Sequence, residues 1–460
     1  MSPFPRITST CIALSVLLAS AEAQRTLSPA EMEEDLFQLT GVLEEKHPGL
    51  LRYSTREEMD GVFGRALHAV EEERGAIEFY RIVAEVVATI RCGHTRAEPA
   101  VLDARAAVSR RGLLPLELLW SGDRLFVLRA LDGSIRPGAE VLSIDGLTVA
   151  ELRSRAFARM SADGFVETGR RRELAAGFAR LYAYLVQEEV DGPFRVLLAG
   201  EEEARSVAEM SPAEFQERQA ERTLPRVIDL DLCPEEDLAI LTVSAFADDA
   251  RGGFPSQLEE AFLRVEETGV GHLVLDLRGN GGGQDMYGAF LVAHLSPVPF
   301  RYFDRIEVTK DYQGQGGIVE RDGSRLVTEH PGTDLQRPAE HRFEGRAWAL
   351  IDGDTFSTAA DVAAVIHARG LAELVGEETG GGYAGNTSGP TEVILLAHSG
   401  ITVSLPKWCY WTADVESDVR GRGVPPAHAL ESTVEDVLAG RDRVLEFVLD
   451  RIRAGDPPPR

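Results

Sequence analysis

The sequence predicts an α/β protein whose helical N-terminal region and β-rich middle region precede an α/β core. Three observations predict this organisation. Apolar residues recur at three- and four-residue steps through most of residues 28–90, which is typical of amphipathic helices. From about Gly112 short alternating runs broken by Gly and Asp replace that pattern. From Arg226 onward strand-like and helix-like segments alternate, as in a sheet packed by helices. We expect these regions to span residues 24–100, 105–210 and 225–455.

Composition narrows the range of partners. The chain has 460 residues, of which 44% are hydrophobic, so it can bury a sizeable core. Its formal net charge is −27, whereas nucleic-acid binding requires a basic surface. We therefore expect no nucleic-acid partner and no affinity for anionic lipid.

The first 23 residues resemble a secretory signal peptide. Arg6 supplies the positive charge, Cys11 to Ala19 an apolar core, and Ala21 to Ala23 a small-x-small cleavage site. The apolar core is too short to span a membrane as a helix, and no later apolar run approaches 18 residues. We expect cleavage before Gln24 and a secreted or periplasmic protein that is not embedded in a membrane.

The cysteines point neither to a disulfide framework nor to a metal site. The mature chain would keep only Cys92, Cys233 and Cys409, which can form at most one bridge. None of the three stands in a metal-ligand spacing. We therefore expect no metal and no cofactor.

Three helices are predicted in the N-terminal region. Ser28 to Glu31 has the form of a capping box, and helical patterns cover residues 31–45, 56–73 and 79–90. The third pattern ends at Cys92-Gly-His-Thr95. A histidine in such a place is usually a helix cap or a surface residue, so His94 gains a functional interpretation only if it meets a nucleophile.

The middle region resembles a PDZ domain with a helical insertion. Strand patterns cover residues 114–120, 125–131 and 138–146, the last closing on the tight-turn pair Asp145-Gly146. Helical patterns follow from Val149 and over residues 165–190, and a further pair of strands covers residues 194–198 and 204–207. Such domains bind an extended peptide along an edge strand. The alternative is a β-rich linker domain without a ligand. The Glu-rich stretch 211–222 is predicted to be a linker.

Strands are predicted in the core at residues 238–243, 272–277 and 347–351, and helices at 254–267, 284–295 and 359–368. The polar, Gly-rich stretch 311–332 is expected to be a loop or flap over the functional site, because loops of that length are usually functional or disordered.

Ser357 occupies a predicted strand-to-helix turn. Unpaired backbone N–H groups and the helix dipole favour developing negative charge at such a turn. A nucleophile that passes through an oxyanion fits this position. The alternative is that Ser357 simply caps the helix, since Ser is a preferred N-cap residue.

The three glycines Gly281 to Gly283 leave bare backbone N–H groups after a buried strand. Neither G-x-G-x-x-G nor G-x-x-x-x-G-K-[ST] is present, which argues against a nucleotide loop. An oxyanion hole is the better interpretation, with one N–H from Gly282 and one from Thr358.

Three ordered motifs carry a family resemblance: Leu275-Asp-Leu-Arg-Gly-Asn-Gly-Gly-Gly283, Thr355-Phe-Ser-Thr-Ala-Ala-Asp361 and Gly376-Glu-Glu-Thr-Gly-Gly-Gly-Tyr-Ala-Gly-Asn386. They resemble the core motifs of the C-terminal processing (tail-specific) and tricorn-type serine peptidases. His47-Pro-Gly49 and Cys92-Gly-His-Thr95 are similar to that family's N-terminal helical cap. The resemblance implies a crotonase/ClpP-like α/β core and Ser357 as nucleophile.

The same resemblance offers two general bases. Tail-specific members have a lysine about 25 residues after the serine, a place filled here by Gly381 and Gly382. Lys407, the nearest downstream lysine, lies in an apparent strand. Tricorn-type members use a histidine before the PDZ domain, and His94 matches that position. We therefore expect His94 to take the Ser357 proton.

The tricorn pattern also has an acidic residue ahead of a Gly-Val-x-Pro segment, which is Gly423 to Pro426 here. Glu416 is the candidate, with Asp418 second. Two departures from the pattern concern this part of the site: Gly93 stands where the pattern has a serine before the histidine, and Ala427 stands where it has an aspartate.

The sequence thus predicts a secreted or periplasmic serine endopeptidase that acts on proteins or peptides through an acyl-enzyme and recognises them through their C-termini. Two alternatives remain. One is a non-catalytic ligand- or peptide-binding member of the same fold. The other is an esterase with the same chemistry, although no G-x-S-x-G elbow is present.

Overall fold

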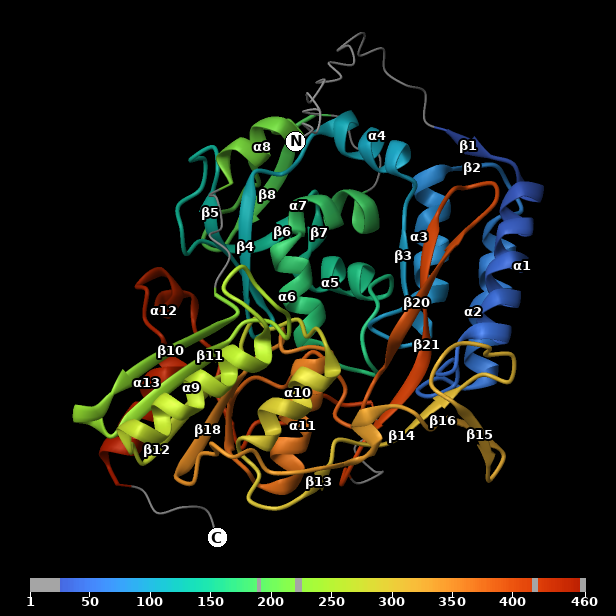
Figure 1. Cartoon of the computed structure of the whole chain (residues 1–460). Coiled ribbons are helices and arrows are strands. Elements are labelled where there is room, and N and C mark those ends of the chain that lie inside the picture. The colour runs from blue at the N-terminus through green and yellow to red at the C-terminus, as the bar shows by residue number, and fades with distance from the viewer. Residues whose placement is uncertain (1–24, 188–191, 220–225, 416–420, 456–460) are drawn as a thin grey trace, which may run out of the picture.

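The computed structural model describes residues 25–187, 192–219, 226–415 and 421–455. Within those residues the chain forms a mixed α/β fold, which confirms the predicted class. Figure 1 shows the N-terminal helices beside a long β-hairpin, the β-rich region above, and the α/β core below. No helix among the described residues is long and apolar enough to cross a membrane.

The N-terminal region contains the three predicted helices: α1 Pro29–Lys46, α2 Arg56–Ala69 and α3 Ala76–Thr89. The capping box at Ser28 and Glu31 is present, and Thr55 with Glu58 forms a second one at the start of α2. Helix α2 ends at Ala69 rather than at the predicted 73, because residues 71–73 are all glutamates that the negative end of a helix dipole disfavours. The short strands β1 Thr26–Leu27 and β2 Arg74–Gly75 pair beside these helices.

Helix α4, Val101–Arg111, is an element that the sequence analysis did not predict. It leads into a sheet of strand order β4-β5-β6-β8-β9, in which β7 also pairs with β6. Helices interrupt this sheet between β7 and β8, as predicted. The strands are β4 Leu116–Ser121, β5 Arg124–Ala130, β6 Glu140–Ile144, β7 Leu147–Thr148, β8 Phe194–Leu198 and β9 Arg205–Val207. The helices are α5 Val149–Phe157, α6 Thr168–Ala176, α7 Phe178–Leu181 and the π-helical turn Tyr182–Val186.

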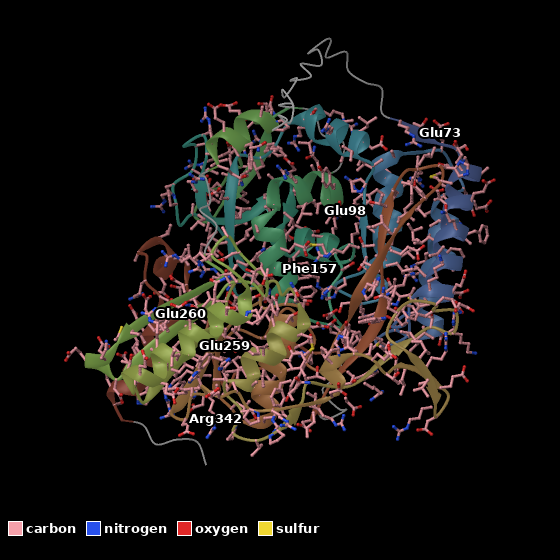
Figure 2. The ribbon with its side chains drawn as sticks, viewed as in Figure 1. Glu73, Glu98, Phe157, Glu259, Glu260 and Arg342 are labelled. Carbon is pink, nitrogen blue, oxygen red and sulfur yellow. The ribbon has the colours of Figure 1, made fainter. Side chains whose placement is uncertain are left out.

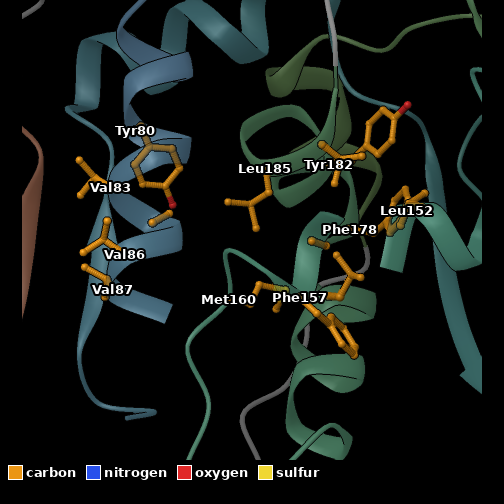
Figure 3. Close-up of a cluster of buried hydrophobic side chains, with 14 of the residues drawn as sticks. Tyr80, Val83, Val86, Val87, Leu152, Phe157, Met160, Phe178, Tyr182 and Leu185 are labelled. Atoms are coloured by element: carbon orange, nitrogen blue, oxygen red, sulfur yellow. The ribbon is translucent and has the colours of Figure 1, made fainter. Parts of the chain in front are cut away.

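Helix α3 packs against the inserted helices. Figure 3 shows Tyr80 of α3 near Leu185 and Met160 of the insertion, and all three belong to one buried cluster. Burial of aliphatic and aromatic side chains is the main force holding such layers together. Helix α3, which precedes the motif containing His94, is therefore packed from the side of the β-rich region.

The core sheet has the order β10-β11-β12-β18-β19-β22, and all its pairs are parallel except β10 with β11. Alternate residues of its strands face opposite layers. Leu273 and Ala349 pack with α9, α10 and α11, whereas Val274 and Trp348 pack with α13. The strands are β10 Ile228–Cys233, β11 Leu238–Val243, β12 His272–Asp276, β18 Arg346–Ile351, β19 Glu373–Gly376 and β22 His428–Ala429; the helices are α9 Phe254–Thr268, α10 Asp285–Ala293, α11 Thr358–Arg369, α12 Val434–Leu438 and α13 Arg443–Arg453.

A second sheet of order β15-β16-β14-β21-β20 connects the core to the N-terminal helices. Its longest strands form the hairpin of β20 Thr387–Leu395 and β21 Thr402–Thr412, which lies alongside α1, α2 and α3 in Figure 1. Strand β21 also pairs with β3 Arg96–Glu98, only two residues beyond His94. The other members are β14 Phe303–Val308, β15 Ile318–Arg321 and β16 Ser324–Val327, and a separate pair joins β13 Phe300–Arg301 to β17 Leu335–Gln336.

Part of the stretch 311–332 differs from the predicted loop. Residues 318–327 form the hairpin β15–β16, which pairs with β14 at the edge of the second sheet. Asp322 and Gly323 form its two-residue turn with positive φ at both positions, which is the turn chemistry that hairpins prefer. Residues 318–327 are therefore a structured sheet edge, whereas residues 311–317 contain no strand or helix.

Charged side chains lie on the surface of both the N-terminal region and the α/β core. Glu73, Glu259 and Glu260, labelled in Figure 2, are exposed glutamates on the N-terminal region and on α9.

The three cysteines of the described residues, Cys92, Cys233 and Cys409, are unpaired.

Candidate active site

The site lies at the carboxyl ends of β12 and β18, which are neighbouring parallel strands. Ligand and catalytic sites of parallel sheets commonly occupy this edge. The glycine loop follows β12 and the turn bearing Ser357 follows β18. The two loops are tied together, because the Phe356 N–H donates to the Asn280 carbonyl over 3.0 Å and the Thr355 hydroxyl donates to the Leu277 carbonyl over 3.0 Å.

Ser357 stands at the N-cap position of α11, but its side chain makes no capping hydrogen bond. Its backbone has φ 53° and ψ −128°, a region that non-glycine residues rarely adopt. Holding a residue there costs on the order of 1–3 kcal/mol, and such strain gathers at functional sites. The simple capping interpretation of Ser357 is therefore wrong, and the strained turn instead leaves its hydroxyl available to another partner.

That partner is His94. Its Nε2 lies 3.0 Å from the Ser357 Oγ, although the two residues are 263 positions apart in the chain. The imidazole also stacks on the Phe356 ring, with centroids 4.7 Å apart and planes inclined by 27°. The helix-cap interpretation of His94 does not describe this arrangement, in which a hydroxyl and a ring nitrogen are within hydrogen-bond distance.

Buried polar contacts hold the backbone around His94. The Thr95 hydroxyl lies 2.7 Å from the Nε2 of His47, and the Gly49 N–H donates to the Nδ1 of His47 over 3.1 Å. Burial lowers the pKa of His47 to about 4, so this histidine is neutral. The Nδ1 of His47 must then be an acceptor, and its Nε2–H donates to Thr95. The His47-Pro-Gly49 motif thus supports the turn that carries His94.

His94 is suited to act as a base near neutral pH. Removal from water is the main effect on its imidazole and lowers the pKa of His94 below the ordinary value of 6.5; the Asp163 carboxylate opposes this shift and Arg96 adds to it. A neutral imidazole can accept the Ser357 proton at Nε2 when its own proton is on Nδ1. That Nδ1 is buried, and it has no hydrogen-bond partner among the residues that the structure describes.

Gly282 and Thr358, the predicted oxyanion-hole residues, both lie against Ser357. A Cβ placed on Gly282 would come within 2.6 Å of the Ser357 Cβ and 3.0 Å of the Thr358 nitrogen. The Thr358 hydroxyl donates to the Gly283 carbonyl over 2.8 Å, which fixes the glycine loop to α11. In this state the Gly282 N–H donates to the Asn280 Oδ1 over 2.8 Å. It would have to leave that acceptor, or share it, to bind an oxyanion.

No lysine lies where the tail-specific pattern has one. A Cβ on Gly381 would come within 2.5 Å of the Ala360 Cβ and 3.1 Å of the Ser357 nitrogen, so neighbouring atoms of α11 and of the turn before it leave no room for a side chain here. Lys407 lies on β21, where its Nζ is 2.6 Å from the Glu392 Oε2 in an ion pair. Glu416 and Asp418, the candidates for the acidic member, fall outside the described residues.

One buried carboxylate near the site was missed by sequence reasoning. Asp163 lies in the segment between α5 and α6, and only 1% of it is exposed. It accepts hydrogen bonds from the Gly93 N–H over 2.8 Å and from the Gly382 N–H over 3.3 Å. A single aspartate in a loop about 70 residues from His94 carries no spacing signal. The one sequence signal was Gly93, which stands where the family pattern has a serine and so indicates that the surroundings of His94 differ from that pattern.

A second buried acid, Asp361, lies one turn into α11 and accepts from the Asn386 Nδ2 at both oxygens over 3.1 Å. Burial, followed by the nearby Asp285 charge, raises its pKa well above the usual carboxyl value. The folded state therefore holds this proton more tightly than the unfolded chain does. The resulting stability is fully present below the unfolded pKa near 4 and is lost as pH rises toward the folded pKa.

We therefore predict that Asp361→Asn, whose side chain has a similar shape and cannot ionise, flattens the dependence of unfolding free energy on pH above about 4. The difference in unfolding free energy between the two proteins should therefore move in favour of the variant between pH 4 and pH 7, because only the wild type ionises in the unfolded state. Urea unfolding between pH 4 and 8 measures both quantities. Parallel pH profiles of the two proteins would contradict a neutral Asp361.

Comparison with known proteins adds to this geometry. Residues 237–429, which include the glycine loop and Ser357, match the model of peptidase family S41. The family supports a serine-type peptidase, a hydrolase that acts on proteins or peptides. His94 and Asp163 lie outside the matched range.

Solved structures extend the likeness of the fold to nearly the whole chain. Mature CPAF is 14% identical, with a TM-score of 0.65 over 93% of this chain and 98% of that chain. Mature CPAF complexed with lactacystin has a TM-score of 0.63 at 14% identity, over 93% and 99% of the two chains. The photosystem II D1 C-terminal processing protease is 18% identical over 89% and 97%, with a TM-score of 0.41. The comparison with curated proteins found no match.

Proposed function

We propose that this protein is an extracytoplasmic serine endopeptidase in which Ser357 forms the acyl-enzyme and His94 is the general base. The observation that carries the proposal is the 3.0 Å contact between the His94 Nε2 and the Ser357 Oγ. A nucleophile and base within hydrogen-bond reach are the geometric signature of covalent acyl transfer. The strained backbone of Ser357 and the adjacent glycine loop support the same chemistry.

The proposed reaction proceeds in two halves. His94 takes the Ser357 proton as the Oγ attacks the scissile carbonyl, and the resulting imidazolium then protonates the leaving amine. His94 then takes a proton from water as its oxygen attacks the ester carbonyl, and gives that proton to the leaving Ser357 Oγ, which releases the acid and restores the enzyme. The Thr358 N–H and an N–H of the glycine loop are the proposed donors to the oxyanion in both halves.

An unfolded protein such as casein tests the proposed activity. The expected result is cleavage into peptides whose new amino termini are interior positions of casein, with loss of cleavage after treatment with a serine-directed phosphonate. Intact casein at high enzyme concentration, together with no phosphonate adduct, would instead favour the non-catalytic binder. Hydrolysis of simple esters without any peptide-bond cleavage would favour the esterase.

The proposal also assigns a PDZ-like role to the β-rich region. Strand β4 is an edge strand of its sheet, and α6 and α7 lie beside it. A cavity lined by Leu116, Glu117 and Ala175 lies between these elements. An edge strand beside a helix supports binding of an extended peptide by β-augmentation. Phe215 of the linker helix α8 Pro212–Arg218 lines the same cavity, so a peptide longer than a few residues would have to displace it.

We therefore predict that substrates are recognised through a free C-terminus. Two peptides identical in sequence, one ending in a carboxylate and one in an amide, should differ in KM by about ten-fold, the equivalent of about 1.4 kcal/mol of binding. The turnover number should change little, because the C-terminus is remote from the scissile bond. Equal KM values for the pair would leave the β-rich region with only a spacing role.

A further inference from the structure

Asp163 has the features of a charge held near His94 for the reaction. Its carboxylate is buried, and its recorded partners are the backbone N–H groups of Gly93 and Gly382. Within the part of the chain that the structure describes, no lysine or arginine is in ion-pair contact with it. The buried Arg52 guanidinium interacts with this charge without forming an ion-pair contact, and a buried carboxylate without a contacting cation is costly for folding. Its retention beside a base that becomes positively charged suggests that the charge is used.

The position of Gly93 explains how this carboxylate approaches the histidine. A Cβ on Gly93 would come within 2.8 Å of the Phe356 ring and 3.2 Å of the Asp163 Oδ1. The side chain of a serine at this position, as in the tricorn pattern, would clash with the Phe356 ring and crowd the Asp163 carboxylate. In this chain the polar group beside His94 therefore comes from the segment between α5 and α6, and not from the residue before the histidine.

The tautomer of His94 gives this charge a function. Accepting the Ser357 proton at Nε2 leaves protons on both ring nitrogens, and Nδ1 is buried without a partner among the described residues. The imidazolium formed during acylation would then be poorly stabilised without a nearby negative charge. The charged groups that act on the imidazole are the Asp163 carboxylate, which favours the imidazolium, and the Arg96 guanidinium, which disfavours it.

We propose that Asp163 is a positioning residue that orders the backbone of Gly93 and stabilises the imidazolium of His94 through its charge. It acts through His94 and does not touch the substrate. This inference rests on the proposed function, since it assigns an acidic group to the same Ser357–His94 site. It places that group in the middle region of the chain, and not in the downstream segment that contains Glu416.

The test compares two isosteric variants. Asp163→Asn keeps one acceptor for a backbone N–H and removes the charge. Asp35→Asn is the matched control, because Asp35 is also buried and accepts from two backbone N–H groups, those of His398 and Ser399, over 2.9 and 2.7 Å. If Asp163→Asn lowers activity only because a buried hydrogen bond to the backbone is weakened, Asp35→Asn should lower activity in the same way. Glu416→Gln is included as the competing acid.

The expected result for Asp163→Asn is a fall of about 10- to 100-fold in kcat with little change in KM, because an opposite charge close to a titrating group is worth about one to three pKa units. The acid limb of the pH profile of kcat/KM should move to lower pH by about one unit, since loss of the carboxylate destabilises the imidazolium. Asp35→Asn should leave this limb in place.

A second measurement does not depend on turnover. Nuclear magnetic resonance titration of labelled histidine in the Ser357→Ala background reports the pKa of His94 directly, and adding Asp163→Asn should lower it. An unchanged pKa of His94 would overturn the inference, even if Ser357 reacts with a phosphonate as proposed. If Ser357 does not react with a phosphonate but Asp163→Asn still lowers the pKa of His94, the proposed peptidase activity is refuted and the interaction between Asp163 and His94 is retained. If Asp163→Asn does not fold, Asp163→Ser replaces it in the same titration.

Discussion

Replacement of Ser357 by alanine is expected to abolish hydrolysis of every peptide substrate while leaving the fold intact. Alanine has no atom that can attack a carbonyl, so turnover should fall by at least about 10⁴-fold, toward the residual rate that binding and the oxyanion donors supply. The side chain of Ser357 makes no capping bond to α11, so its removal should change stability little. Steady-state kinetics and thermal unfolding measure the two effects.

Ser357→Gly is the matched control for this variant. Glycine also lacks the hydroxyl, but it adopts positive φ without the penalty that alanine shares with serine. Both variants should therefore be inactive. Replacement by glycine normally lowers the free energy of unfolding because the unfolded chain gains flexibility. At position 357 the relief of backbone strain should offset part of that loss. Turnover in either variant within about 100-fold of the wild type, beyond contamination by wild-type enzyme, would remove Ser357 from the mechanism.

Replacement of His94 by alanine is the change with the next largest expected effect. Turnover should fall by about two to four orders of magnitude, the usual contribution of a positioned proton transfer. The wild-type activity should also decline on the acid side below the ordinary histidine pKa of 6.5, because burial lowers the pKa of His94 and only the neutral imidazole accepts a proton. Turnover as a function of pH measures both.

Lys407→Ala is the control for the alternative base. Lys407 is paired with Glu392 on β21, so its loss should leave turnover close to that of the wild type. The competing assignment would be favoured if Lys407→Ala were inactive and His94→Ala kept full turnover. In that case the contact between the His94 Nε2 and the Ser357 Oγ would have only a structural role.

The elements closest to the nucleophile were the most predictable from sequence. An apolar strand, a turn and an Ala-rich helix are local patterns, and β18, Ser357 and α11 lie where these patterns indicated. The pairing of β21 with β3 could not be predicted in this way. It joins residues about 300 positions apart, and no local pattern indicates which strand will be a partner.

The residues of the site also divide into those that local sequence patterns predict and those that depend on contacts between distant parts of the chain. Ser357, Gly282 and Thr358 come from adjacent strand ends and could be grouped by the order of the motifs. His94 could be placed only through a family pattern, because three separate regions of the chain must assemble before its ring faces Ser357. Asp163 could be predicted neither from the order of the motifs nor from the family pattern, since nothing in its local sequence distinguishes it from any other loop aspartate. Its importance depends on the space that Gly93 leaves open.

The central claim is that Ser357 is an activated nucleophile, and mass spectrometry after treatment with a serine-directed fluorophosphonate tests it most directly. The account predicts one adduct per chain, located on the peptide that contains Ser357, which forms more slowly in His94→Ala and is absent from Ser357→Ala. An unlabelled wild-type protein, or an adduct on a different serine that persists in Ser357→Ala, would contradict it.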